Sequence, residues 1–200
     1  MPIIYSKVTS EPALEPISLT EAKLDLKVDD TTDNSLIDIL RQVSRETVEK
    51  RTNRSLITQT RVAKLDYFPN CSTILLPNGP VQSVTSIKYY AVDGDPLITL
   101  ASSEYWVDTS SDIARIVVKD SWPSTEDMPN AVEITYICGY GSVATNVPSP
   151  LRKACFMILA HLYENRQAVV MSGSPTAVVE VPLGAEYLMS NYILEQVVTY

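Results

Sequence analysis

The fold class follows from residues 57–68, Ile57-Thr-Gln-Thr-Arg-Val-Ala-Lys-Leu-Asp-Tyr-Phe68. Here the residue pattern changes from one typical of helices to one typical of strands. This stretch is rich in β-branched and aromatic residues, which favour strands, and Pro69-Asn70 ends it. Further strand-like runs follow at short intervals: 73–76, 81–92, 105–108, 113–118 and 131–138. No helix-length segment separates them, so they predict an antiparallel sandwich or barrel rather than βαβ units.

The segments between these runs have the chemistry of turns. One contains Pro77-Asn78-Gly79-Pro80, and Asp93-Gly94 between two strand-like runs predicts a hairpin. Gly139-Tyr140-Gly141 follows the last run but lacks the third glycine and the immediate helix of a nucleotide-binding turn. We therefore interpret these glycines as a tight exit from the sheet.

Two helices are predicted before the β block. Ser18-Leu-Thr-Glu21 has the pattern of a capping box and begins the short first helix. The second is predicted over residues 34–50, where apolar residues at spacings of three and four form one buried face. Those residues are Leu36, Ile37, Leu40, Val43 and Val48. The predicted polar face consists of Arg41, Arg45, Glu46, Glu49 and Lys50.

The helical period returns after the β block. Pro150 suits the first turn of a helix whose apolar face runs from Leu151 to Tyr163. The run Met171-Ser-Gly-Ser-Pro175 is typical of a hinge, and residues 178–181 are β-prone. A last amphipathic segment is predicted over residues 183–198.

The order of these segments predicts an α+β protein in which a helical body contains an inserted antiparallel β domain. We expect four parts: an N-terminal arm and helices over 1–55, the β domain over 56–147, a helix on the N-terminal helices over 148–170, and a hinge with a C-terminal tail over 171–200.

Composition excludes several classes of function. The 200 residues carry a formal charge of −8, so a general basic surface for nucleic acid is not expected. The start lacks the pattern of a signal peptide and no apolar run is long enough for a bilayer, which predicts an intracellular product with no membrane contact. Three scattered cysteines contain no CxxC pair.

Nothing in the sequence supports catalysis or a cofactor. His161 is the one histidine, so a multi-histidine metal site is impossible, and no G-x-S-x-G motif accompanies it. The acidic cluster at Asp29, Asp30 and Asp33 lacks the spacing of an EF-hand loop. We expect no enzyme activity, no metal and no cofactor.

Tyrosine is unusually frequent, with eleven tyrosines against two phenylalanines. Tyrosine is common on surfaces half buried against a partner. Tyr187, Tyr192 and Tyr200 follow the hinge, and two interpretations stay open. The tail folds onto its own domain, or it docks into another chain.

The succession of motifs resembles the tailed-bacteriophage head–tail connector family, also called adaptor or head-completion proteins. The first half of the resemblance is carried by Pro16-Ile-Ser-Leu-Thr-Glu-Ala-Lys23, Leu26-Lys-Val-Asp29, Asp33-Asn-Ser-Leu-Ile37, Val48-Glu-Lys-Arg-Thr52, Ser55-Leu-Ile-Thr-Gln-Thr60, Leu76-Pro77, Val81-Gln-Ser-Val84 and Ile87-Lys-Tyr-Tyr90. The second half is carried by Asp93-Gly94, Tyr105-Trp-Val-Asp108, Ser121-Trp122-Pro123, Ile134-Thr-Tyr136, Gly139-Tyr140-Gly141, Pro148-Ser-Pro-Leu-Arg152, Ala160-His161-Leu-Tyr163-Glu-Asn-Arg166 and Ala168-Val169. These motifs cover residues 16 to 170.

The resemblance implies a structural virion protein at the head–tail junction, made and assembled in the host cytoplasm. Members of the family form a ring of about twelve copies under the portal. The ring extends the DNA channel without binding DNA specifically, and it meets a stopper or tail-terminator protein on its other side. A stopper or tail-terminator ring protein is the alternative role. A carbohydrate- or host-recognition β module is a more remote alternative.

Two sets of contact residues are expected from this reading. The segment after Pro182 is predicted to dock on the portal, because a hinge precedes an amphipathic stretch. Its contact residues are Leu183, Tyr187, Leu188, Tyr192, Ile193 and Leu194. Possible subunit-interface residues are Arg41, Arg45, Glu49 and His161.

Overall fold

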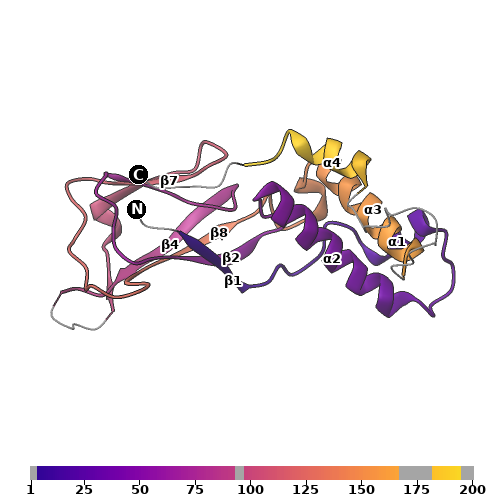
Figure 1. Cartoon of the computed structure of the whole chain (residues 1–200), viewed down its shortest axis with the longest axis horizontal. Coiled ribbons are helices and arrows are strands. Elements are labelled where there is room, and N and C mark those ends of the chain that lie inside the picture. The colour runs from indigo at the N-terminus through magenta and orange to yellow at the C-terminus, as the bar shows by residue number, and fades with distance from the viewer. Residues whose placement is uncertain (1–3, 93–96, 167–181, 195–200) are drawn as a thin grey trace, which may run out of the picture. The chain divides into compact units, whose positions relative to one another are not determined.

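The computed structural model describes residues 4–92, 97–166 and 182–194, and the chain forms two compact units (Figure 1). The β unit contains residues 4–13 and 53–142 with Leu194. The helical unit contains residues 14–52, 143–166 and 182–193. Helices and antiparallel strands occupy separate stretches of the chain, which confirms the predicted α+β class.

The larger sheet of the β unit has five antiparallel strands in the order β1-β2-β8-β4-β5. These are β1 (Tyr5–Ser10), β2 (Gln59–Leu65), β8 (Val132–Cys138), β4 (Val81–Tyr89) and β5 (Ile98–Thr99). The last strand in sequence, β8, lies at the centre. It pairs with β2 along its whole length, from Gln59 opposite Cys138 to Leu65 opposite Val132.

The second sheet has the order β3-β7-β6, formed by β3 (Thr73–Leu75), β7 (Arg115–Val118) and β6 (Tyr105–Asp108). A short 3-10 helix, η1 (Ser102–Glu104), leads into β6. Both sheets contribute to one hydrophobic core: Ile87 and Ile134 come from the larger sheet, and Ile74 and Ile116 from the smaller. Two sheets on one core match the sandwich alternative. Each strand order ends at edge strands, so the described strands do not close a barrel.

The edge strand β1 is an element that the sequence did not predict. Its segment, YSKVTS, is mostly exposed, and it forms because its backbone pairs with β2. The buried Tyr136 of β8 adds a side-chain link, since its hydroxyl lies 3.0 Å from the Ser6 hydroxyl and donates to the Pro77 carbonyl oxygen at 3.0 Å. The predicted hairpin turn at Asp93-Gly94 lies outside the described residues.

The exit from β8 requires glycine. Gly139 has φ of 120°, and a Cβ atom there would lie 2.5 Å from the backbone of Ile57. The Gly139 amide donates to the Pro80 carbonyl oxygen at 2.8 Å, and the Gly141 carbonyl oxygen accepts from Thr58 at 3.0 Å. Close backbone approach therefore explains the glycine, as the sequence interpretation proposed.

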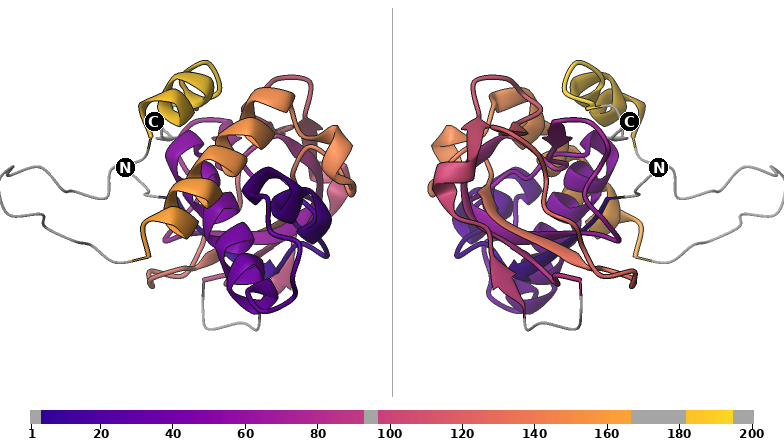
Figure 2. Two further views of the ribbon diagram at one scale, coloured as in Figure 1. Left: turned by 90° about the vertical axis from the view of Figure 1, so that its right-hand side faces the viewer. Right: turned by 90° about the vertical axis from the view of Figure 1, so that its left-hand side faces the viewer.

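The helical unit consists of α1 (Leu19–Leu26), α2 (Asn34–Thr52), α3 (Ser149–Glu164) and α4 (Leu183–Ser190), with a 3-10 turn, η2 (Ala144–Asn146), before α3. Within this unit, α3 packs against the other three helices (Figure 2). Its buried face includes Ala154, Ile158 and Leu159, and Pro150 occupies the first turn as predicted.

The predicted C-terminal elements are described only in part. The hinge at residues 171–175 and the β-prone run at 178–181 lie outside the described residues. Of the amphipathic segment predicted over 183–198, the structure describes residues 183–194. The helix in this part ends at Ser190, and a turn follows in which the Tyr192 amide donates to the Met189 carbonyl oxygen.

Replacing Ile87 by alanine tests the shared core. Ile87 is fully buried in β4, and the change leaves a cavity between the two sheets. We expect the free energy of unfolding to fall by about 2–5 kcal/mol in chemical denaturation. The matched control is Ile98→Ala on the neighbouring strand β5, where the side chain is 36% exposed and the expected loss is below about 1 kcal/mol. Equal losses would contradict this account of the core.

Candidate assembly surfaces

Three arginines of the helical unit converge on residues 15–18, the extended segment before α1. Arg41 donates from Nε to the Ile17 carbonyl oxygen at 2.7 Å, and Arg152 donates from Nε to the Pro16 carbonyl oxygen at 2.9 Å. These carbonyl groups belong to no helix or strand, so the arginine side chains satisfy them. We call the three residues the arginine clamp: Arg41, Arg45 and Arg152.

Arg45 is the buried member of the clamp, with 2% of its surface exposed. Its Nε donates to the Glu15 carboxylate at 2.8 Å and its Nη1 to the Glu49 carboxylate at 3.0 Å, while Glu46 lies 3.6 Å from Nη2. Burial by itself lowers the pKa of Arg45, but these carboxylates outweigh it and raise the pKa overall. The guanidinium therefore stays charged and fixes α2 against the segment before α1.

The capping box predicted at Ser18 is confirmed, and the clamp extends to it. The Glu21 amide donates to the Ser18 hydroxyl at 3.2 Å, the Ser18 amide donates to the Glu21 carboxylate at 2.9 Å, and Arg152 lies 2.8 Å from that carboxylate. The Ser18 amide is the main cause that lowers the pKa of Glu21. This stabilisation is present at neutral pH and is lost as the pH falls below about 4.

The burial of α2 corrects the predicted orientation of this helix. Ile37 and Val48 are fully buried, as the pattern predicted. Arg45 and Glu49 are buried as well, although both were assigned to the polar face, and Glu49 is only 8% exposed. The reason is the clamp, which turns these charged side chains inward and rotates part of the apolar stripe toward the surface.

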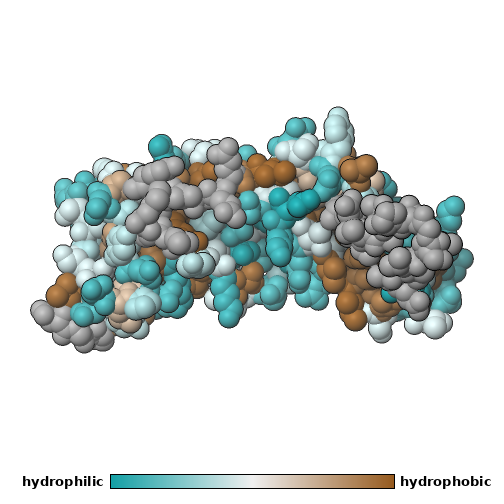
Figure 3. Space-filling model, in the orientation of Figure 1, coloured by the Kyte–Doolittle hydropathy of each residue, from teal (hydrophilic) through white to brown (hydrophobic). Residues whose placement is uncertain are grey.

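The exposed part of that stripe forms a continuous strip along α2. Ile39 is 60% exposed and Val43 is 38% exposed, and Leu36 and Leu40 beside them are half-buried. Figure 3 shows hydrophobic side chains gathered over α2. We call these four residues the α2 flank. Ile39 was not among the predicted face residues, although its spacing of four from Val43 places the two on one side of the helix.

The helix α4 carries a second exposed apolar pair. Ala185 and Met189 are buried against the rest of the helical unit, whereas Leu183 is 81% and Tyr187 is 78% exposed. Leu188 is half-buried. Of the predicted portal-docking residues on α4, the structure thus brings Leu183 and Tyr187 together at the surface.

The remaining predicted docking residues follow α4. Tyr192 is half-buried and Ile193 is 52% exposed. Leu194 is buried, and its carbonyl oxygen accepts a hydrogen bond from Asn53 within the β unit at 2.8 Å. The side chain of Leu194 is therefore not available at the surface in the way the predicted amphipathic helix would place it.

The possible subunit-interface residues do not form one surface. Arg45 and Glu49 belong to the buried network, and the Arg41 side chain is only 12% exposed. His161 is half-buried on α3, where Asn165 donates to its main-chain carbonyl oxygen at 2.9 Å. Their part in contacts between subunits stays a prediction.

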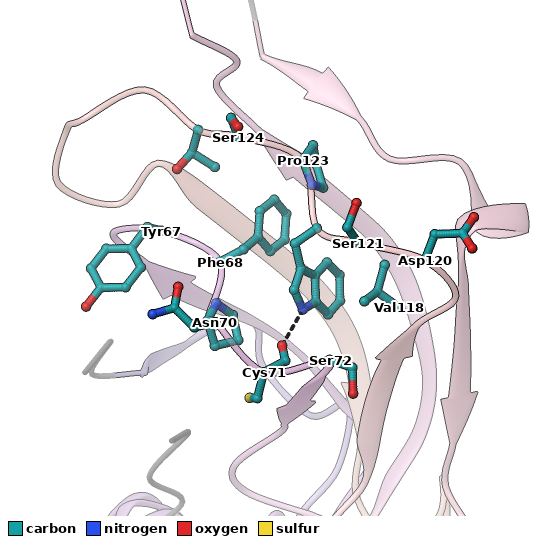
Figure 4. A pocket seen from close by; sticks show the side chains of 13 residues that line it. Tyr67, Phe68, Asn70, Cys71, Ser72, Val118, Asp120, Ser121, Pro123 and Ser124 are labelled. Carbon is teal, nitrogen blue, oxygen red and sulfur yellow. Dashed lines mark hydrogen bonds between the residues drawn. The ribbon is translucent and has the colours of Figure 1, made fainter.

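The β unit contains an open pocket of about 590 Å³ between residues 67–72 and 118–125 (Figure 4). The ring of Trp122 stacks on Phe68 with 4.8 Å between the ring centroids. The indole N–H of Trp122 donates to the Cys71 carbonyl oxygen at 2.9 Å. These contacts hold the two loops together, which gives the aromatic residues of the pocket a structural explanation.

Within residues 4–92, 97–166 and 182–194, no three side chains of the types that ligate metals lie close enough to share an ion. In the same part of the chain, no helix is both long enough and apolar enough to cross a membrane.

The clamp can be tested by replacing Arg45 with methionine. The change removes a buried guanidinium that pairs with the half-buried Glu15 and the buried Glu49, so we expect the free energy of unfolding to fall by about 3–5 kcal/mol. The matched control is Arg51→Met on the same helix. Its ion pair with Glu186 is exposed, so the expected loss is about 0–1 kcal/mol. Chemical denaturation measures both, and equal values would contradict the central role of Arg45.

Comparison with known proteins finds matches of structure but not of sequence. No family model matches the chain, and no curated protein matches it. A chain from the neck of an empty gene transfer agent (GTA) particle, computed with C6 symmetry, has a TM-score of 0.76 at 17% identity and the match covers 97% of both chains.

Two further structures of GTA particles match in the same way. A chain of the native GTA virion has a TM-score of 0.72 at 18% identity, and a chain of the native GTA neck computed with C12 symmetry has a TM-score of 0.68 at 20% identity. Each match covers 96% of this chain and 97% of the other. The fold is therefore shared with chains from the neck and virion of a phage-like particle, consistent with the resemblance to head–tail connector proteins.

Proposed function

We propose that this chain is a structural neck protein, an adaptor that forms a ring of about twelve copies between the portal and the tail of a tailed phage or phage-like particle. The observation that carries the proposal is the match to a GTA neck chain over 97% of both chains. Such a match includes both units, so the whole architecture supports the proposal rather than one widespread module. The motifs over residues 16–170 support the same conclusion.

The portal is the proposed partner of α4 and the residues after it. Leu183 and Tyr187 project from a helix whose other side is anchored by Ala185 and Met189. An anchored helix presents its apolar pair at little ordering cost, and each Å² of buried apolar surface contributes about 25 cal/mol. Repetition around a ring multiplies such weak contacts through effective concentration.

The ring would extend a channel through which DNA passes without specific binding. The formal charge of −8 disfavours attachment to phosphates. A stopper or tail-terminator protein is the proposed partner on the side away from the portal, and the virion is the proposed location. No observation favours the stopper, the tail-terminator or the host-recognition role over the adaptor role for this chain itself.

The proposal is tested by imaging the full chain with its portal protein by cryo-electron microscopy. We expect a closed ring on the portal for the wild type, and loss of portal attachment for the double variant Leu183→Ala/Tyr187→Ala. Substitution is sharper than truncation at Pro182, because truncation also removes the buried Ala185 and Met189.

Leu24→Ala is the matched control for that experiment, because Leu24 is an equally exposed leucine, at 80%, on α1. It should attach to the portal like the wild type. A wild type that neither forms rings nor binds its portal would overturn the adaptor role. Normal attachment of the double variant would show that α4 is not the docking element.

We further expect no duplex-DNA binding tighter than micromolar at physiological salt, because a formal charge of −8 disfavours contact with phosphates. Fluorescence anisotropy with a labelled duplex measures this directly. Tight binding that weakens steeply as salt increases would contradict it, since that dependence reports released counterions.

A further inference from the structure

The α2 flank is an apolar strip that the described part of the chain leaves uncovered. Leu36, Ile39, Leu40 and Val43 follow spacings of three and four residues, which is the pattern of a helix face made to be buried. Within this strip, Ile39 is 60% and Val43 is 38% exposed. Scattered exposed aliphatic residues need no explanation, but a continuous strip on one helix indicates a contact surface.

The helix cannot bury this strip by rotating. Arg45 and Glu49 lie on another, buried side of α2, and Arg45 is held there by its ion pair with Glu15, which lies outside the helix. Turning the α2 flank inward would pull these charges out of their network. The uncovered strip is thus a consequence of the arginine clamp, and no described residue of the helical unit covers it.

The border of the α2 flank indicates what that partner is. Glu46 and Lys50 continue the spacing of Ile39 and Val43 beyond the C-terminal end of the strip and are both exposed, so the border at that end carries one charge of each sign. Two copies of a chain with a charge of −8 repel each other, and association is least opposed where the local charge cancels. An apolar centre with a charged border of both signs is also the usual composition of a protein interface.

We propose that the α2 flank is a contact with a second copy of this chain. The proposal rests on the proposed function and deepens it by assigning one surface of the subunit contact. In a ring the contact is heterologous, so the α2 flank of one copy meets a different surface of the next. The portal is assigned to the apolar pair of α4, which leaves the α2 flank for the neighbouring subunit.

Labelling of a cysteine introduced at position 43 tests directly whether a second copy of the chain covers the α2 flank. The probe is Val43→Cys in a Cys71→Ser background, because Cys71 is half-buried whereas the two other cysteines are fully buried. Burial also raises the pKa of the Cys155 thiol, which keeps it unreactive. We expect rapid maleimide labelling of dilute, unassembled protein and labelling at least tenfold slower in the assembled ring.

A charge substitution provides the second measurement. Ile39→Glu should weaken assembly at least tenfold in sedimentation velocity, because it places a carboxylate in the apolar centre of the contact. Leu24→Glu is the matched control and should assemble like the wild type, since Leu24 lies outside the α2 flank. The unfolding midpoint of Ile39→Glu should match that of the control, because Ile39 is exposed in the single chain.

Each other outcome has a definite meaning. Slow labelling of the unassembled protein would show that the chain covers the strip itself. Labelling that stays rapid in rings formed without portal and slows only when portal is added would assign the strip to the portal. Both outcomes overturn the proposal. Rapid labelling in assembled rings, or normal assembly of Ile39→Glu, would overturn it while the proposed function stands. A wild type that never forms rings, alone or with portal, would overturn the proposed function together with this contact.

Discussion

The buried ion pairs of Arg45 are the constraint on which the helical unit depends. A guanidinium with 2% exposure needs partners for its charge, and Glu15 and Glu49 supply them from two different segments. The contact with Glu15 fixes the rotation of α2 and holds the segment before α1. The exposed strip on α2 follows from that rotation. One charged side chain therefore helps to set which apolar residues of α2 are buried and which are exposed.

The β unit is held by a different interaction. Its two sheets share an apolar core in which Ile74, Ile87, Ile116 and Ile134 are all fully buried. The central strand β8 connects this core to both neighbouring strands, and Tyr136 extends the connection to the edge strand β1 through Ser6. Burial of apolar area, rather than paired charge, is the main stabilising term here.

The two kinds of stabilisation suit a protein that assembles. A helix that is anchored on one side can expose apolar residues on its other side. On α4, Ala185 and Met189 are buried, so Leu183 and Tyr187 stay at the surface. In the proposed ring, the negative charge would keep separate copies apart until many weak contacts act together. An open pocket whose aromatic rings bind its own loops fits the same picture of a structural component.

The sequence by itself determined the elements with strong local signals. Strand composition and turn residues predicted β2, β3, β4, β6, β7 and β8 within a few residues, and Ser18 with Glu21 predicted the start of α1. Local patterns succeed there because caps, turns and strand composition act between residues close in the chain. The strand β1 and the buried side of α2 depended on the tertiary structure. Backbone pairing of an exposed segment leaves no apolar pattern, and charged residues become buried only when a partner such as Glu15, thirty residues away, neutralises them.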